Sequence, residues 1–405
     1  MSTVATTSLP RGTGINPTPL GVSLLLILLG ALYLAQAVSA KQAALFVVGA
    51  LLGLALYHAA FGFTSSWRVF IADGLGAGLR AQMIMLAVGV ALFFPALSAG
   101  TLFGNPVTGL VSPAGTSVVI GAFLFGVGMQ LGGGCASGTL YTVGGGSTRM
   151  IVTLLAFIAG SVIATAHMPF WTSLPQLKPI SLVKTLGLAP ALLLNWLVFA
   201  AIAAITVVVE KRRHGRLVGP DLPASRGATW LHGPWPLVAG AITLVLLNFA
   251  TLALSGRPWG VTSAFALWGA KAASSIGIDT ASWAYWSTKA NAAALAAPVS
   301  RDVTSVMDIG IVLGAMAAAA LAGRYAPVWK LPLRSFIAAV AGGLLLGYGA
   351  RLAYGCNIGA YFSGIVSGSL HGWLWLVAAF IGNVFGTRLR PLFGLEVERV
   401  KPSGC

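Results

Sequence analysis

The sequence has few charged residues and very few acidic ones. Of its 405 residues only 8% are charged, and 24 Lys and Arg outnumber 8 Asp and Glu, which gives a net charge of +16. A soluble domain of this length needs about a quarter of its residues charged, so the composition excludes one. The hydrophobic fraction is 57%. We predict an all-α polytopic membrane protein, because apolar runs of about 20 residues cross a bilayer as helices and not as barrel strands.

Other absences narrow the function. Three cysteines, of which Cys405 ends a polar tail, are too few for a disulfide framework. With no His-x-x-His or Cys-x-x-Cys pair, we expect no metal site and no cofactor. The chain has no Gly-x-x-x-x-Gly-Lys-Ser/Thr phosphate loop, which argues against ATP hydrolysis. Its basic residues form no patch interleaved with aromatic residues, so we expect no nucleic-acid partner.

Ten apolar stretches are long enough to cross the bilayer. They lie at about 20–39, 42–62, 79–98, 115–131, 147–167, 189–209, 235–254, 303–323, 333–352 and 371–388. Four intervening stretches are too short or too broken by glycine to cross, yet too apolar to be ordinary loops: 63–78, 132–146, 255–280 and 353–370. We expect re-entrant half-helices there, since irregular backbone is tolerated at membrane depth only where it lines a cavity or is buried in protein.

The spans and charges predict how the chain is divided. We expect an N-terminal cytoplasmic tail, a first membrane repeat with extra helices, a basic cytoplasmic linker, a second membrane repeat and a C-terminal tail, at 1–19, 20–209, 210–234, 235–390 and 391–405. If the linker is cytoplasmic, alternation of the spans places 16 of the 24 basic residues on its side. The positive-inside rule then predicts that both termini are cytoplasmic.

One frame of glycine and cysteine occurs twice. Gly126–Tyr141 and Gly347–Tyr361 both obey G-x-G-x-x-L-x-x-G-C-x-x-G, and each places its cysteine, Cys135 or Cys356, in a break. We therefore predict a duplicated unit with one cysteine in each half.

A second motif supports the duplication. Gly-x-Thr-Ser follows the second span at 62–65 and the seventh at 260–263. Because five crossings separate these two spans, the repeats are predicted to be inverted in the membrane. Cys135 then enters from the cytoplasmic side and Cys356 from the opposite side. Transporters of this organisation place their sites near the midplane, between the repeats.

The cysteine frames suit an anion path. Neutral thiols donate weak hydrogen bonds without adding negative charge, and sulfur is a polarizable partner for a sulfur-bearing substrate. Short helices opening at Ala136 and Asn357 would turn free N–H groups towards that path. The candidate path residues are Cys135, Cys356, Gly134, Gly355, Gly138, Gly359, Asn357, Thr64, Ser65, Thr262 and Arg351.

Each of these assignments has an alternative. Glycines also pack membrane helices closely, and a free cysteine is often a small buried apolar residue. Arg351 has three possible roles: drawing an anion from the outer side, pairing with Asp308 or Asp302, or snorkelling to the interface. These two aspartates are also the candidates for proton coupling, because no other acid lies in or beside a later span.

The motifs resemble those of the YeeE/YedE family of bacterial inner-membrane sulfur transporters. The resemblance rests on GGGCASGTL at 132–140, GCNIG at 355–359 and GFTSSWR at 62–68. It implies a multi-pass protein of the bacterial inner membrane that takes up thiosulfate along membrane-embedded cysteines, through S–H to S hydrogen bonds. It also implies an hourglass-shaped interior and, for some relatives, a small cytoplasmic sulfur-carrier partner. This chain departs from the family at Gly62, where better-known members carry a third cysteine; Thr64, Ser65 and Ser66 offer hydroxyl groups nearby.

The sequence therefore predicts a transporter, not an enzyme, that imports thiosulfate or a related sulfur-containing anion across the bilayer past Cys356 and then Cys135. A membrane thiol-disulfide redox protein that cycles these two cysteines is the alternative. A structural subunit in which the cysteines only pack is a third hypothesis.

Overall fold

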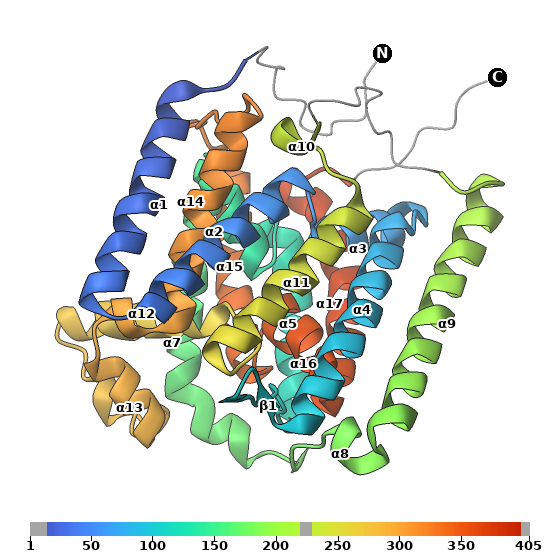
Figure 1. Cartoon of the computed structure of the whole chain (residues 1–405). Helices are drawn as coiled ribbons and strands as arrows, with labels where there is room; N and C mark the ends of the chain where they lie inside the picture. The colour runs from blue at the N-terminus through green and yellow to red at the C-terminus, as the bar shows by residue number, and fades with distance from the viewer. Residues whose placement is uncertain (1–13, 219–228, 398–405) are drawn as a thin grey trace.

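The computed structural model describes residues 14–218 and 229–397 and is helical almost throughout (Figure 1). In this part of the chain ten helices are long and apolar enough to cross a membrane, as predicted. Each of the ten spans begins with one of the long helices, and four of the spans continue into the short helix that follows. The long helices are α1 (Pro17–Ala37), α2 (Ala40–His58), α4 (Ala77–Ala99), α5 (Thr116–Gly132), α7 (Thr148–Ser173), α9 (Leu188–His214), α11 (Leu237–Ser255), α14 (Val303–Leu321), α15 (Leu333–Leu352) and α17 (Leu370–Leu389). The protein is a multi-pass membrane protein.

The four predicted breaks are short helices. They are α3 (Phe63–Asp73), α6 (Ala136–Gly144), α12 (Thr262–Ser275), and the π-helix η3 (Asn357–Phe362) that continues into α16 (Ser363–Val366). We call the end of the molecule at which α9 terminates the basic end, since Lys211, Arg212 and Arg213 lie in its last turn. The other end is the far end. α3 lies towards the basic end, whereas α12 and α16 lie towards the far end (Figure 1).

Short connecting elements complete the fold. β1 (Thr101–Leu102) pairs with β2 (Asn105–Pro106), and β3 (Ala114–Gly115) pairs with β4 (Gln176–Leu177), both antiparallel. The β3–β4 pair joins the start of α5 to the end of α7, so the intervening α6 lies at the opposite, basic end. The remaining pieces are α8 (Leu182–Leu186), α10 (Thr229–His232), α13 (Lys289–Ala296), η1 (Thr280–Ser282), η2 (Val299–Arg301) and η4 (Arg390–Phe393).

The predicted tails and linker are only partly described. Residues 1–13, 219–228 and 398–405 lie outside the described residues. In the parts that are described, α1 begins inside the predicted N-terminal tail, α9 runs into the predicted linker and η4 runs into the predicted C-terminal tail. The start of α1 lies at the basic end (Figure 1), where Asn16 N–H donates to Ala320 O at the end of α14.

The helix that carries each glycine frame packs against the long helix that follows the other frame. α5 packs against α15 and α17, and α15 packs against α5 and α7. A Cβ atom at Gly126 of α5 would collide with Ala379 and Asn383 of α17, and one at Gly347 of α15 would collide with Phe157 and neighbouring residues of α7. The first glycine of each frame therefore lets its helix approach the long helix that follows the other frame. Such close approach is the usual role of small residues between membrane helices.

Candidate functional site

Each frame cysteine stands immediately before the first residue of a short helix. Cys135 precedes α6, and its Sγ accepts a hydrogen bond from Gly138 N–H at 3.4 Å. Cys356 precedes η3, and its Sγ accepts from Ile358 N–H at 3.4 Å. Both are free thiols, and both are buried. The expectation that short helices open at Ala136 and Asn357 is confirmed, and each sulfur occupies the capping position next to free N–H groups of a first helical turn.

The glycine before each cysteine presses against that first turn. A Cβ at Gly134 would lie 3.2 Å from Gly138 C and Thr139 N, and one at Gly355 would lie 3.0 Å from Gly359 C and 2.7 Å from Ala360 N. Both frames thus need a small residue before the cysteine, although the turns differ: Cys135 precedes an α-helix, whereas Cys356 precedes a π-helix. At Gly355, with φ +150°, the backbone conformation also favours glycine.

The two cysteine turns lie next to each other inside the protein. α6, which begins just after Cys135, contacts η3, which begins just after Cys356. Both belong to one large buried cluster of apolar residues. The two breaks, which enter from opposite ends, thus bring their cysteines together in the interior.

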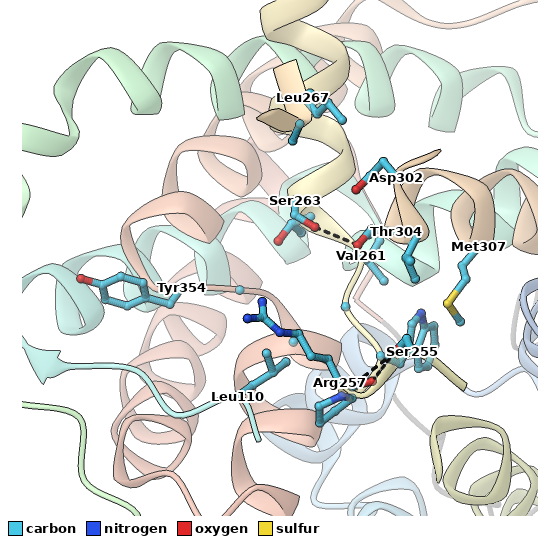
Figure 2. A pocket seen from close by; sticks show the side chains of 18 of the residues that line it. Leu110, Ser255, Arg257, Val261, Ser263, Leu267, Asp302, Thr304, Met307 and Tyr354 are labelled. Carbon is cyan, nitrogen blue, oxygen red and sulfur yellow. Dashed lines mark hydrogen bonds between the residues drawn. The ribbon is translucent and has the colours of Figure 1, made fainter. Parts of the chain in front are cut away.

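A cavity of about 520 Å³ leads from the far end to the second cysteine frame. Of the predicted site residues, Thr262, Arg351, Gly355 and Gly359 line it. Cys356, which follows Gly355 in the sequence, is 0% exposed and is not itself among the lining residues. Figure 2 shows its polar wall, where Ser263 donates to Thr304 at 3.0 Å. No atom lies within 4 Å of the place where a Cβ at Gly359 would be, so this wall is open.

The cavity is basic. Arg257, Arg301 and Arg351 line it together with one acid, Asp302. This acid is already engaged, because its carboxylate accepts hydrogen bonds from Ser305 N–H at 2.8 Å and from the Ser305 hydroxyl at 2.5 Å. Positive charge in a concave site with low-dielectric walls concentrates anions.

Arg351 is held at the cavity wall by a tyrosine. Its Nη1 donates to Tyr285 Oη at 2.8 Å, and the guanidinium carbon lies 5.8 Å from the centre of the Tyr285 ring. Within the described chain the structure forms no ion pair between Arg351 and Asp308 or Asp302. Anion attraction and snorkelling therefore stay as the predicted roles of Arg351.

The other predicted residues lie outside this cavity. Asn357 is fully buried, and neither atom of its amide has a hydrogen-bond partner within the described residues. The Thr64 hydroxyl is likewise buried and unpartnered in that part of the chain. Ser65 Oγ donates to Gly62 O at 3.1 Å and occupies the space that a side chain at Gly62 would need. A hydroxyl group therefore fills the position at which the family pattern leads one to expect a thiol.

A polar network that was not predicted from the sequence lies on the basic side of the first frame. Gln130 occupies the position matched by Arg351, and its Nε2 donates to Thr64 O at 3.2 Å and to Asn383 Oδ1 at 2.6 Å. Arg68 donates to Gln130 Oε1 at 3.5 Å. A polar residue such as Asn383 within an apolar span was an available signal.

Comparison with known proteins supports the sulfur-transport reading. A family model described as Sulphur transport matches residues 58–385. The chain is 33% identical over 179 residues to the probable transporter YedE of Salmonella typhimurium, a match that covers 44% of each chain and so less than half of that relative. It is 28% identical over 350 residues to the thiosulfate transporter TsuA of Spirochaeta thermophila, covering 83% of this chain and 95% of that protein. TsuA of Escherichia coli is 26% identical over 353 residues, covering 83% and 91%.

The family match includes both cysteine frames, the short helices that carry them and nine of the ten long helices, in whole or in part. The multi-pass helical fold agrees with the resemblance that the motifs suggested. The chain belongs to the Sulphur transport family, to which the YeeE/YedE proteins belong.

Proposed function

We propose that this protein imports thiosulfate, or a closely related sulfur-containing anion, from the far end to the basic end, past Cys356 and then Cys135. The observation that carries the proposal is the pair of matching cysteine turns, buried and adjacent, with a basic cavity reaching one of them. Two relatives are named thiosulfate transporter TsuA, which favours the same substrate.

The direction of transport follows from charge. The last turn of α9 and the loop after it are basic, so the positive-inside rule places the basic end in the cytoplasm. The far end, with its cavity, then faces outwards, across what we propose is the bacterial inner membrane. An anion would enter among three arginines and meet the Cys356 turn first. We propose that both termini are cytoplasmic for the same reason.

The chemistry of the cysteine turns suits thiosulfate. Helix N–H groups attract the oxyanion end, and each neutral S–H group can donate a weak hydrogen bond to the terminal sulfur. Because the thiols remain uncharged, they do not repel a dianion in the low-dielectric interior. Transfer from one thiol to the next needs no covalent bond, which distinguishes this route from the redox alternative.

Matching pairs of helix contacts support the inverted repeat. The first glycine of one frame packs α5 against α17, and the first glycine of the other packs α15 against α7. Likewise α2 packs on α14, and α11 packs on α4. These pairs are the ones expected if 40–173 and 237–389 are two copies related by a pseudo-two-fold axis in the membrane plane. Under this proposal the substrate crosses at the interface of the copies.

A ligand comparison tests the substrate. We expect thiosulfate to stabilise the purified protein against thermal unfolding, because a ligand that binds only the folded state raises its melting temperature. Sulfate shares the charge and the oxyanion but lacks the terminal sulfur, so it should give a smaller shift, and sulfite and sulfide should fall below thiosulfate. Equal shifts from thiosulfate and sulfate would refute a site that selects for sulfur.

The cavity arginine gives a kinetic prediction. Replacing Arg351 with Gln should raise the KM for thiosulfate about tenfold, because a partly desolvated charge close to a dianion contributes on the order of 1.4 kcal/mol. Tyr285→Phe keeps the charge and loses only its hydrogen bond, so it should have a smaller effect. The exposed Arg324, which follows α14 at the basic end, supplies a matched Arg→Gln control. An unchanged KM in Arg351→Gln would remove the cavity from the uptake route.

A further inference from the structure

We propose that Asp308 is a proton-binding site linked to anion passage, so that a proton gradient drives uptake; this inference rests on the transport function proposed above. Asp308 lies in α14 and is 0% exposed. Neither oxygen of its carboxyl group has a hydrogen-bond partner in the part of the chain that the structure describes. A charged carboxylate in that position would be strongly disfavoured.

Three other acids in or beside the long helices are engaged. Glu210 accepts from Arg80 at 2.6 Å and from Gly76 N–H at 3.0 Å, and Asp73 is paired with Arg213 at 3.4 Å. Asp302 accepts from Ser305, as described above. These contacts give each of those carboxylates a structural role. Asp308 has none, so its burial has no structural explanation among the described residues.

Comparison of the two proposed copies shows that position 308 differs from its counterpart in α4. The sixth residue of α14 is the aspartate, and the sixth residue of α4 is Gln82. Gln82 Oε1 accepts from Trp67 Nε1 at 2.9 Å and from Tyr361 Oη at 3.4 Å. The residues that match these two donors in the other copy are Phe265 and Leu140, which carry no donor. One copy thus holds a hydrogen-bonded amide, and the other an ionisable group left without donors.

The carboxyl group lies near the path. Val303, Thr304 and Met307, in the first turns of α14, line the cavity together with Gly355 and Gly359, and Asp308 directly follows Met307. On the elements that pack against α14 the other ionisable side chains are Tyr33 on α1, Lys41, Tyr57 and His58 on α2, Tyr141 on α6, His232 on α10, Lys271 on α12 and Arg301 in η2. None of them forms an ion pair with Asp308 in the described chain. Lys271, for example, donates to the backbone oxygens of Leu295 and Ala297.

Charge repulsion supplies the coupling. An anion at the Cys356 turn is repelled by a carboxylate at position 308 and not by the neutral acid, which can also donate one hydrogen bond. Anion binding and proton binding therefore strengthen each other, and the linkage must be reciprocal. A proton taken up from the far end would cross with the anion and be released at the basic end. No covalent or redox step is required.

Uptake by purified protein in liposomes tests this coupling. Radiolabelled thiosulfate uptake is measured with the outside more acidic than the lumen and again at equal pH. The wild-type protein should be several-fold faster with the gradient, whereas Asp308→Asn should show the same rate in both conditions. Asp73→Asn is the matched control at the basic end and should respond as the wild type does. A gradient response that persists in Asp308→Asn, or that is absent from the wild type, would overturn the proposal.

A second variant and an exchange assay decide the cases in which Asp308→Asn or the wild-type protein shows no uptake. If Asp308→Asn shows no uptake at all, Asp308→Glu decides, because it restores an ionisable group. A gradient response in Asp308→Glu supports proton binding, and uptake without such a response overturns it. If the wild-type protein fails to exchange labelled for unlabelled thiosulfate at equal pH, the proposed transport function itself has failed, independently of the proton site.

Discussion

Replacing either Cys135 or Cys356 with serine is expected to lower thiosulfate uptake by more than about tenfold. A serine hydroxyl keeps a helix-capping acceptor at the same position but removes the polarizable sulfur that the substrate would contact. The fold should therefore survive while the path is interrupted. Uptake of radiolabelled thiosulfate, and growth with thiosulfate as the only sulfur source, are the measurements.

The oxidation state of the two cysteines distinguishes the proposed anion path from the alternatives. If the anion passes from one thiol to the next by hydrogen bonds, both thiols stay free. Alkylation followed by mass spectrometry should then label them equally in denatured protein prepared under oxidising and under reducing conditions. Loss of labelling under oxidising conditions would favour the redox protein. Normal growth on thiosulfate of cells that carry the Cys→Ser variants would favour the third hypothesis, in which the cysteines only pack. Cys135→Ala should also lose the cap, at a cost of about 0.5–2 kcal/mol.

Substituting Gly355 with alanine is expected to be the most destabilising single change in the cysteine turns. Its φ of +150° lies outside the range that alanine prefers, and the new Cβ would stand 2.7 Å from Ala360 N. Strained backbone costs about 1–3 kcal/mol, and overpacking adds a similar amount. The Gly355 carbonyl also accepts from Trp375 Nε1 at 3.2 Å, which any shift would disturb.

Gly359→Ala is the matched control for this prediction. A methyl group there meets no atom within 4 Å, so the melting temperature of the purified protein should stay near that of the wild type. Because the methyl group enters the cavity, uptake should nevertheless fall. If the Gly355→Ala protein had the same melting temperature as the wild type, the turn would be less constrained than its geometry indicates.

The long helices could be predicted from sequence because their signal is local. Each predicted start lies within about three residues of the observed one, since apolar composition alone marks a span. The ends were less well predicted. α7 continues to Ser173 and α9 to His214, because a helix can extend beyond the hydrocarbon once polar residues are stabilised by water or by neighbouring segments.

The cavity could be predicted only in part. Arg351, Gly355 and Gly359 were found from the repeated frame, but Tyr285 and Arg301 come from the connection between α12 and α14, which has no repeat partner or apolar pattern. The bond from Arg351 to Tyr285 joins residues 66 positions apart. No local pattern reports such a contact, which depends on how the far-end loops fold over the helices.

The basic side of the first frame illustrates a second limit. Gln130 occupies the frame position matched by Arg351, but its bond to Asn383 spans 253 positions. Likewise the sequence shows that Gly62 lacks a thiol, yet only packing shows that the Ser65 hydroxyl fills the space beside it. Motifs therefore located the cysteine turns, and tertiary contacts determined their surroundings.

Transport by purified protein in liposomes tests the central claim most directly, because no other transporter contributes. Vesicles with the wild-type protein should accumulate radiolabelled thiosulfate, and vesicles with the Cys135→Ser/Cys356→Ser double variant should match empty vesicles although this variant melts with the wild type. Equal uptake by the double variant and the wild type would contradict a path through the two thiols.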